Sequence, residues 1–377
     1  MRIEQVDLRV VSLPLVAPFR ASWGMETERV AVLVRVCGTI GGSGGAIEGW
    51  GECVAMREPL YSPEYVDGAI DVLRRHLVPR LLGTEAVTAD GVADLFRAVQ
   101  GHPMAKAAVE LSLLDAEGRA SGQSLRSRFG ATRERVDVGV VVGMTGSIDE
   151  VVDAVASRVA EGYRRVKVKI GPGHDRAVLA AIRAAFPYLA LWADANAAYV
   201  AYGEGARGDL KALDDLAIGL IEQPFAPERM LDHAALAREI ATPVCLDETI
   251  ISDAVAADAL ALGACSVINI KPGRVGGYLE AIRIHDRCLH TGIDAWCGGM
   301  LETGIGRAAN LALAALPGFT RPGDISATDR YFHADLTAPF VLAPDGTLAV
   351  PSGPGIGVPV DPAAIKVCTR WTETMTR

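Results

Sequence analysis

Charged residues recur at a nearly constant interval in the middle of this chain, each within or at the end of a short apolar run. The runs are VKVKI around Lys169, LWAD at Asp194, IGLIE at Glu222, PVCLD at Asp247 and SVINIK at Lys271. Successive members of this set lie 25, 28, 25 and 24 residues apart. An interval of this length holds one strand, one helix and their loops. The pattern therefore predicts repeated strand–helix units with a charged residue at the same end of each strand.

Seven such units follow one another from about residue 135, and an eighth is expected near residues 304–326. Ser147 and Glu150 form a capping-box pattern at the start of one predicted helix, and Ser252 starts another that Gly263 ends. No GxGxxG motif follows the first strand, which argues against a dinucleotide-binding sheet. The expected fold is a (β/α)-barrel, in which the carboxyl ends of the strands carry the active site.

The two ends of the chain do not follow this alternation. Residues 3–14, 30–37 and 48–54 are rich in β-formers, and residues 63–121 have helical spacing of leucine and valine. The glycine-rich stretch 38–49 joins two of these strands. It lacks a Lys-Ser/Thr pair and a following helix, so we interpret it as a hairpin tip and not as a phosphate-binding loop.

The C-terminal tail contains Asp345-Gly346, a hairpin signal between two strand-like runs, and is expected to pack on the N-terminal part. The fold class is therefore α/β, a barrel with an α+β capping domain built from both ends of the chain. The expected domains are a cap at 1–130, a catalytic barrel at 131–330 and a returning tail at 331–377.

Composition limits the classes of partner. The net charge of -9 argues against nucleic acid, which requires clustered Lys and Arg. No signal peptide and no apolar run of membrane-spanning length is expected. The seven cysteines are scattered and have no metal-ligand spacing, which indicates reduced thiols in a cytoplasmic protein.

The three carboxylates predict a metal site. One Asp or Glu at a strand end is usually a turn former or a helix cap, but Asp194, Glu222 and Asp247 fall on three successive strands. Held close together, they would repel one another unless some took up protons or shared a divalent cation. Oxygen-only ligation favours Mg²⁺, which Mn²⁺ can replace.

The lysines predict acid/base chemistry. Lys167 and Lys169 lie two residues apart and point to the same face of one strand, and Lys271 lies four strands further round. The alternative for a single buried lysine is a structural salt bridge. A second cation nearby would lower the pKa of Lys169 toward the range that a base needs and would attract an anionic substrate. Two lysines on opposite walls suit removal of a proton from one face of a small carboxylate and its return on the other. The metal would stabilise the enediolate.

At this point the chain resembles a known group. Its motifs are similar to those of the muconate lactonising subgroup of the enolase superfamily: KxK at 167–169, DAN at 194–196, IEQP at 221–224, LDE at 246–248 and NIKPGRVGG at 269–277. The stretch WCGGMLETGIGRAAN at 296–310 resembles o-succinylbenzoate synthases that also racemise N-acylamino acids. The resemblance runs through nearly the whole chain and includes RASWG at 20–24.

The resemblance implies a modified (β/α)7β barrel under a cap, with an even-numbered homo-oligomer as the expected assembly. It implies that Asp194, Glu222 and Asp247 bind Mg²⁺ and that Lys169 and Lys271 are the acid/base pair. Asn196 and Lys167 would lie beside the substrate carboxylate. Four further residues would contact the substrate: Trp23, Met56, Gly298 and Met300. Synthase activity would imply a place in menaquinone biosynthesis.

Alternatives stay open within and outside this superfamily. A muconate cycloisomerase would share the lysines and ligands. A dipeptide epimerase would carry an Asp-x-Asp pair near the eighth strand, where this chain has only Asp324. A mandelate-racemase type would need a His near the seventh strand, and residues 293–300 contain none. The most distant alternative is a barrel that binds a carboxylate without catalysis.

Overall fold

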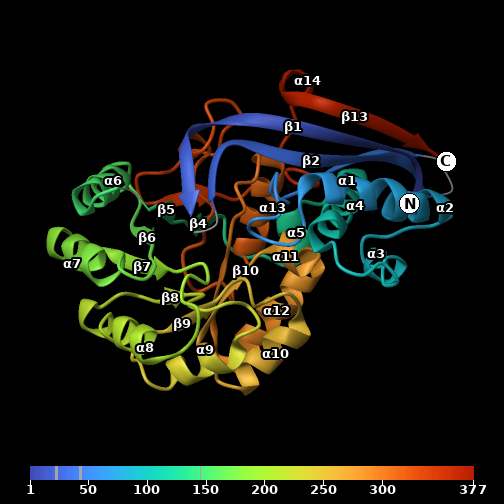
Figure 1. The fold of residues 1–377 in the computed structure, drawn as a ribbon. Coiled ribbons are helices and arrows are strands. Elements are labelled where there is room, and N and C mark those ends of the chain that lie inside the picture. The colour runs from blue at the N-terminus through green and yellow to red at the C-terminus, as the bar shows by residue number, and fades with distance from the viewer. Residues whose placement is uncertain (22–23, 42–44, 145) are drawn as a thin grey trace.

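Two sheets dominate the computed structural model, which describes residues 1–21, 24–41, 45–144 and 146–377 (Figure 1). One is a seven-stranded parallel sheet in the order β11-β10-β9-β8-β7-β6-β5, and the other is a four-stranded sheet in the order β13-β1-β2-β3. Neighbouring strands of the parallel sheet are consecutive in the chain. This arrangement confirms the predicted α/β barrel with its antiparallel cap.

The barrel strands are short and buried, as their runs of Val, Ile and Leu predict. They are β5 (Val140–Val142), β6 (Arg165–Lys169), β7 (Ala190–Asp194), β8 (Ile221–Glu222), β9 (Val244–Leu246), β10 (Val267–Ile270) and β11 (Asp294–Cys297). The helices that follow these strands are α6 (Ile148–Ala160), α7 (Arg176–Ala185), α8 (Glu204–Lys211), α9 (Met230–Ala237), α10 (Asp253–Ala261), α11 (Pro272–Val275), α12 (Tyr278–Thr291) and α13 (Gly304–Ala314). A 3-10 turn at Asp214–Leu216 precedes β8.

Local signals start and end these helices as the sequence predicts. Ser147 and Glu150 form both hydrogen bonds of the capping box of α6. The Ser252 side chain accepts a hydrogen bond from the amide of Val255 at the start of α10, and Gly263 follows its end with φ of 64°.

The segment after α13 closes the barrel. Its Gly323 forms a parallel bridge with Val138 beside β5, and its Phe319 forms one with Ala295 of β11. The amide of Asp324 also donates to the carbonyl of Cys297 at 3.0 Å. Residues 319–324 therefore occupy the eighth strand position, through isolated bridges and not through a regular ladder.

The cap contains β1 (Arg2–Ala21), β2 (Gly24–Ile40) and β3 (Gly45–Cys53), followed by α1 (Val66–Val72), a π-helical turn (Leu73–Leu77), α2 (Val78–Gly83), α3 (Val92–Leu95) and α4 (Pro103–Ser121). β3 lies very close to α4. A Cβ atom on Gly51 would come within 1.9 Å of the carbonyl oxygen of Ala108, so only glycine fits at this position. β2 and β3 pair as far as Ile40 and Gly45, which supports the hairpin interpretation. Residues 42–44 of its tip lie outside the described residues.

The C-terminal part of the chain returns to the cap. α14 (Pro362–Cys368) leads into β13 (Thr369–Thr376), which pairs antiparallel with β1 so that the red and dark blue strands lie side by side in Figure 1. The remaining elements link cap and barrel: α5 (Leu125–Phe129), β4 (Arg135–Asp137), a 3-10 turn (Thr328–Arg330) and β12 (Thr347–Ala349).

The hairpin predicted at Asp345-Gly346 is wrong in its pairing. The turn is present, and the Asp345 side chain accepts a hydrogen bond from the hydroxyl of Thr347 at 2.6 Å. However, only β12 flanks it, and this strand pairs with β4, far away in the sequence.

Within the described part of the chain, no helix combines the length and apolar character that a membrane span requires. None of the seven cysteines is in a disulfide, and five are buried.

Candidate active site

The parallel register places the recurring charged residues at one level. Lys169 pairs with Asp194, and Asp194 pairs with Glu222, in the ladders of β6, β7 and β8. Asp247 and Lys271 come directly after β9 and β10. The carboxyl ends of five successive strands therefore bring these side chains together, as their spacing predicts.

Lys167 lies at the centre of a buried charge cluster. Its Nζ is 3.1 Å from Oδ2 of Asp194, 2.5 Å from Oε2 of Glu222 and 2.6 Å from Oδ2 of Asp324. The other oxygen of Asp324 pairs with Arg165 at 2.5 Å. Lys167 is thus held by three carboxylates, an arrangement that sequence spacing alone did not indicate.

The two candidate acid/base lysines have separate partners. Nζ of Lys169 donates to Oδ2 of Asp194 at 2.7 Å and also to Oδ1 of Asn196. Nζ of Lys271 donates to Oδ2 of Asp247 at 2.7 Å and to the hydroxyl of Tyr61 at 2.9 Å. Each lysine therefore pairs with one candidate metal ligand and one neutral polar group.

Burial and neighbouring charge shift the pKa values of the carboxylates in opposite directions. Burial raises the pKa of Asp194, but Lys167 and Lys169 outweigh it and lower this pKa to about 2. Burial and the charge of Asp194 raise the pKa of Glu222 to about 8. Glu222 therefore tends to hold a proton. This is expected for a buried carboxyl group beside a negatively charged one.

The basic groups respond to the same cluster. Burial lowers the pKa of Lys271, but the charge of Asp247 outweighs it, so that this pKa lies above its usual range. The pKa of Lys167 is raised in the same way by Asp194, Asp324 and Glu222 against burial. Lys167 lies beside Lys169 as expected, and the acidic side chains of Asp194, Asp324 and Glu222 surround its ammonium group. The expected effect of Lys167 on Lys169 stays a prediction.

The donor set fits an oxygen-ligated divalent cation. Asp194, Glu222 and Asp247 are buried acidic side chains on adjacent strands, and Oδ1 of Asn269 is a buried acceptor without a hydrogen-bonding partner among the described residues. As these side chains lie, no three acidic, His or Cys groups of the described residues converge enough to enclose a metal. The Lys167 ammonium lies between Asp194 and Glu222, so metal binding there requires that it moves aside.

A small cavity of about 60 Å³ opens onto the lysines. Of the residues predicted to contact substrate, Asn196, Met56 and Met300 line it together with Lys167, Lys169 and Lys271. Gly298 follows β11 and makes room for its neighbours, since a Cβ atom there would lie 2.2 Å from Oδ1 of Asn269 and 2.7 Å from Cγ of Lys271. Trp23 lies outside the described residues.

Sequence reasoning missed several residues of this site. Tyr61 comes from a cap loop, more than 200 residues from Lys271, and no pattern marks it. Arg274 was recoverable, because it lies three residues after Lys271, on the single turn of α11, and binds the other oxygen of Asp247. Phe19 and Tyr331 line the cavity from the cap and from the segment after the barrel, and their rings meet edge to face at 6.4 Å.

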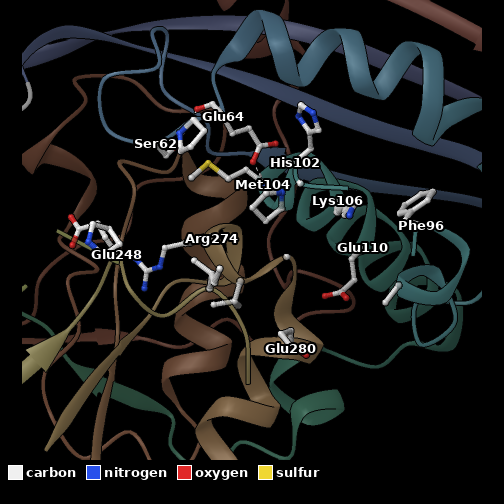
Figure 2. A pocket seen from close by; sticks show the side chains of 18 of the residues that line it. Ser62, Glu64, Phe96, His102, Met104, Lys106, Glu110, Glu248, Arg274 and Glu280 are labelled. Atoms are coloured by element: carbon white, nitrogen blue, oxygen red, sulfur yellow. Dashed lines mark hydrogen bonds between the residues drawn. The ribbon is translucent and has the colours of Figure 1, made fainter. Parts of the chain in front are cut away.

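A second, larger recess of about 920 Å³ lies between the cap helices and the barrel (Figure 2). Glu64, Lys106 and Glu110 belong to its cap side, and Glu248 and Arg274 to its barrel side. Tyr61 and Asn196 line both this recess and the small cavity. These two side chains therefore form part of the wall between the two spaces.

A parallel barrel under an antiparallel cap, with carboxylates and lysines at the strand ends, defines a barrel enzyme of the enolase type. Two family models match the chain: the mandelate racemase / muconate lactonizing enzyme N-terminal domain over residues 5–130 and an enolase C-terminal domain-like model over residues 150–364. The chain thus belongs to the mandelate racemase/muconate lactonizing enzyme family of the enolase superfamily, which confirms the resemblance seen in its motifs.

Similar proteins cover nearly the full length. An N-succinylamino acid racemase of an Amycolatopsis species is 51% identical over 95% of both chains, and one of Thermus thermophilus is 42% identical over 100% of this chain and 99% of the relative. An o-succinylbenzoate synthase of Geobacillus kaustophilus is 41% identical over 100% and 98%. A crystal structure of an enolase superfamily member from Listeria innocua has a TM-score of 0.92 and 39% identity, covering 100% of this chain and 99% of that one.

Proposed function

We propose that this enzyme removes the proton next to the carboxylate of an N-succinylamino acid and returns it on either face, which racemises the substrate. The same groups would also suit the dehydration reaction of an o-succinylbenzoate synthase. The observation that carries the proposal is that Lys169 and Lys271 line one cavity from strands four positions apart. A single base would need only one of them.

Each lysine would act on one face of the α-carbon. Lys169 would remove the proton from one enantiomer while Lys271 delivers a proton to the opposite face, and the roles reverse for the other enantiomer. In the dehydration, Lys169 would remove the α-proton and then help hydroxide leave as water, while the Lys271 ammonium stabilises the enediolate. Lys167 and Asn196 lie beside these lysines and would orient the substrate carboxylate.

Asp194, Glu222 and Asp247 would hold Mg²⁺, or Mn²⁺ in its place. When bound, the ion supplies positive charge against the negative charge that develops on the substrate carboxylate. Asp247 shared with an ion would stabilise the Lys271 ammonium less, so the pKa of Lys271 would fall toward the range that a base needs.

The alternatives have less support. Both carboxylate oxygens of Asp324 are engaged by Lys167 and Arg165, so this residue does not offer the free acceptor that the amine of a dipeptide would need. A muconate cycloisomerase would share the lysines, but the muconate cycloisomerase 1 of Rhodococcus opacus is only 28% identical to this chain. A non-catalytic barrel has no use for two lysines on opposite walls. The seven unpaired cysteines support a cytoplasmic location.

Isotope exchange tests the proposal. Each enantiomer of N-succinylphenylalanine is incubated with the protein and Mg²⁺ in D2O, and the α-position is followed by proton NMR and chiral chromatography. We expect exchange with inversion, loss of both with EDTA, and recovery with added Mg²⁺. Lys169→Ala and Lys271→Ala should each abolish inversion, while each retains exchange of the enantiomer that faces the remaining lysine.

The outcomes separate the two reactions. Absence of exchange with either enantiomer would exclude the racemase and move the test to the synthase substrate. Dehydration of that substrate without racemisation would leave the synthase alone. Inversion that survives in Lys271→Ala would contradict the two-lysine mechanism.

A further inference from the structure

The side-chain amide of Asn196 connects a candidate base to a residue outside the metal-ligand set. Its Oδ1 accepts a hydrogen bond from Nζ of Lys169, and its Nδ2 donates one of 2.9 Å to Oε1 of Glu248. An amide has an acceptor end and a donor end. Rotated by half a turn, Asn196 would present an NH2 group to a lysine that can itself only donate while it is charged.

Glu248 settles this orientation. A carboxyl group keeps an acceptor oxygen whether or not it is protonated, so it holds the Nδ2 end of the amide in either form. The Oδ1 end is then directed at Lys169. The backbone amide of Asn196 adds a hydrogen bond of 2.9 Å to Oδ1 of Asp194, and the residue has φ of 40°, so its position is fixed locally as well.

Stability alone does not explain this use of Glu248. Its second oxygen, Oε2, is buried and has no hydrogen-bonding partner in the described part of the chain, which is unfavourable for a residue that serves only packing. Glu248 lies on the barrel wall of the large recess (Figure 2), and Asn196 lines the same recess. Burial of Oε2 is therefore unfavourable for folding. A functional role for the other oxygen, Oε1, which accepts the hydrogen bond from Asn196, would explain why a glutamate occupies this position.

We propose that Glu248 is a positioning residue for Lys169: through the amide of Asn196, it holds this lysine in line with one face of the substrate. The proposal rests on the proposed function. It predicts an asymmetry, because hydrogen bonds through Asn196 link Glu248 to Lys169, whereas Glu248 acts on Lys271 only through its charge. Among the described residues, the hydrogen bonds of Lys271 go to Asp247 and Tyr61. Glu248→Gln also lacks the charge, so it separates the two effects. Loss of Glu248 should therefore affect one face of the α-carbon far more than the other.

The experiment measures the two faces separately. Initial rates of α-deuterium uptake are recorded for each enantiomer of N-succinylphenylalanine, and Lys169→Ala and Lys271→Ala identify which enantiomer depends on which lysine. Glu248→Met keeps the approximate volume and removes the acceptor. We expect exchange on the Lys169 face to slow by about tenfold or more and exchange on the Lys271 face to stay within about twofold.

Three further variants make the result specific. Glu248→Gln retains an acceptor oxygen without the charge and should restore most of the lost rate. Glu248→Ala removes the same acceptor and replaces Glu248→Met if the latter does not fold. Glu280→Gln is the matched control, because Glu280 lines the same recess and binds Arg283 and the amide of Asp253, away from the lysines. It should leave both rates unchanged.

The outcomes are distinct. Equal slowing on both faces, or no slowing in a folded Glu248→Met protein, would overturn the positioning role and leave the proposed function intact. No exchange in the wild-type protein would overturn the proposed function, and this inference with it. Loss on the Lys169 face that Glu248→Gln rescues would establish the role.

Discussion

At the scale of single residues, the site depends on close approach as much as on charge. Gly298 is the clearest case, because β11 passes so near Asn269 and Lys271 that no side chain fits between them. This glycine is not required by backbone conformation. It is required by the space that the side chains of Asn269 and Lys271 occupy.

Gly298→Ala should therefore displace Lys271 and leave the rest of the barrel folded. We expect exchange on the Lys271 face to fall at least tenfold, with a loss of stability of about 1–3 kcal/mol from overpacking. Gly83→Ala is the control, since a Cβ atom there meets nothing within 4 Å. Unchanged exchange rates in Gly298→Ala, measured beside its thermal midpoint, would contradict this role of the glycine.

The residues of the site differ in how far sequence could reveal them. Asp194, Glu222, Asp247 and the lysines follow from strand spacing, because parallel strands convert a constant interval into a common level. Tyr61 reaches Lys271 only through the docking of the cap, and nothing local encodes that contact. Arg165, Lys167 and Asp324 form a chain of ion pairs that depends on side-chain direction inside the barrel, which periodicity does not provide.

At the scale of elements, buried glutamates of the cap hold the amino ends of helices. Glu52 accepts hydrogen bonds from the amides of Thr303 and Gly306 at the start of α13. Glu110 of α4 accepts them from Tyr278 and Leu279 at the start of α12. Both barrel helices are thus capped from the other part of the chain, which fixes the cap in register with the strand ends.

Glu110 gives stability a pH dependence. Burial raises its pKa to about 7 against the effect of the two amides, from an ordinary value near 4.5. The unfolded chain then loses its proton first, so the free energy of unfolding falls as pH rises from about 4.5 to about 7, by up to about 3 kcal/mol from this group.

Glu110→Gln keeps an acceptor for the helix amides and removes the titration. Its free energy of unfolding, measured with urea between pH 4.5 and 8, should fall less over this range than that of the wild type. Glu110→Ala should be less stable at every pH by about 1–2 kcal/mol, because it leaves the helix amides without their partner. Parallel curves for wild type and Glu110→Gln would show that Glu110 does not titrate in this range.

At the scale of the whole molecule, the cap and the barrel share one core, and the cluster at the strand ends carries its own counter-charges. The alternation of the barrel was readable in the sequence, and so was the return of the tail to the cap. The sequence predicted the closing segment 319–324 only approximately. This segment joins its neighbours through isolated bridges, so its sequence lacks the alternating pattern of a regular strand.

The internal ion pairs should make folding independent of the metal. Lys167, Lys169, Lys271 and Arg274 already pair with the candidate ligands, so EDTA should abolish turnover while the secondary structure is retained. Excess Mg²⁺ should raise the thermal midpoint only through binding, by an amount that grows with its concentration. Unfolding on chelation, observed by circular dichroism, would show that the metal is structural.

The segment that closes the barrel also brings Asp324 to Lys167 and Arg165. Until this last strand position is filled, Arg165 has no ion-pair partner among the described residues and Lys167 lacks one of its three, although both are enclosed by apolar strands. An incomplete ring therefore suffers an electrostatic penalty in addition to its missing backbone hydrogen bonds. Ring closure and charge balance at the centre become a single event, which disfavours half-assembled forms and makes the folding of the barrel more nearly all-or-none.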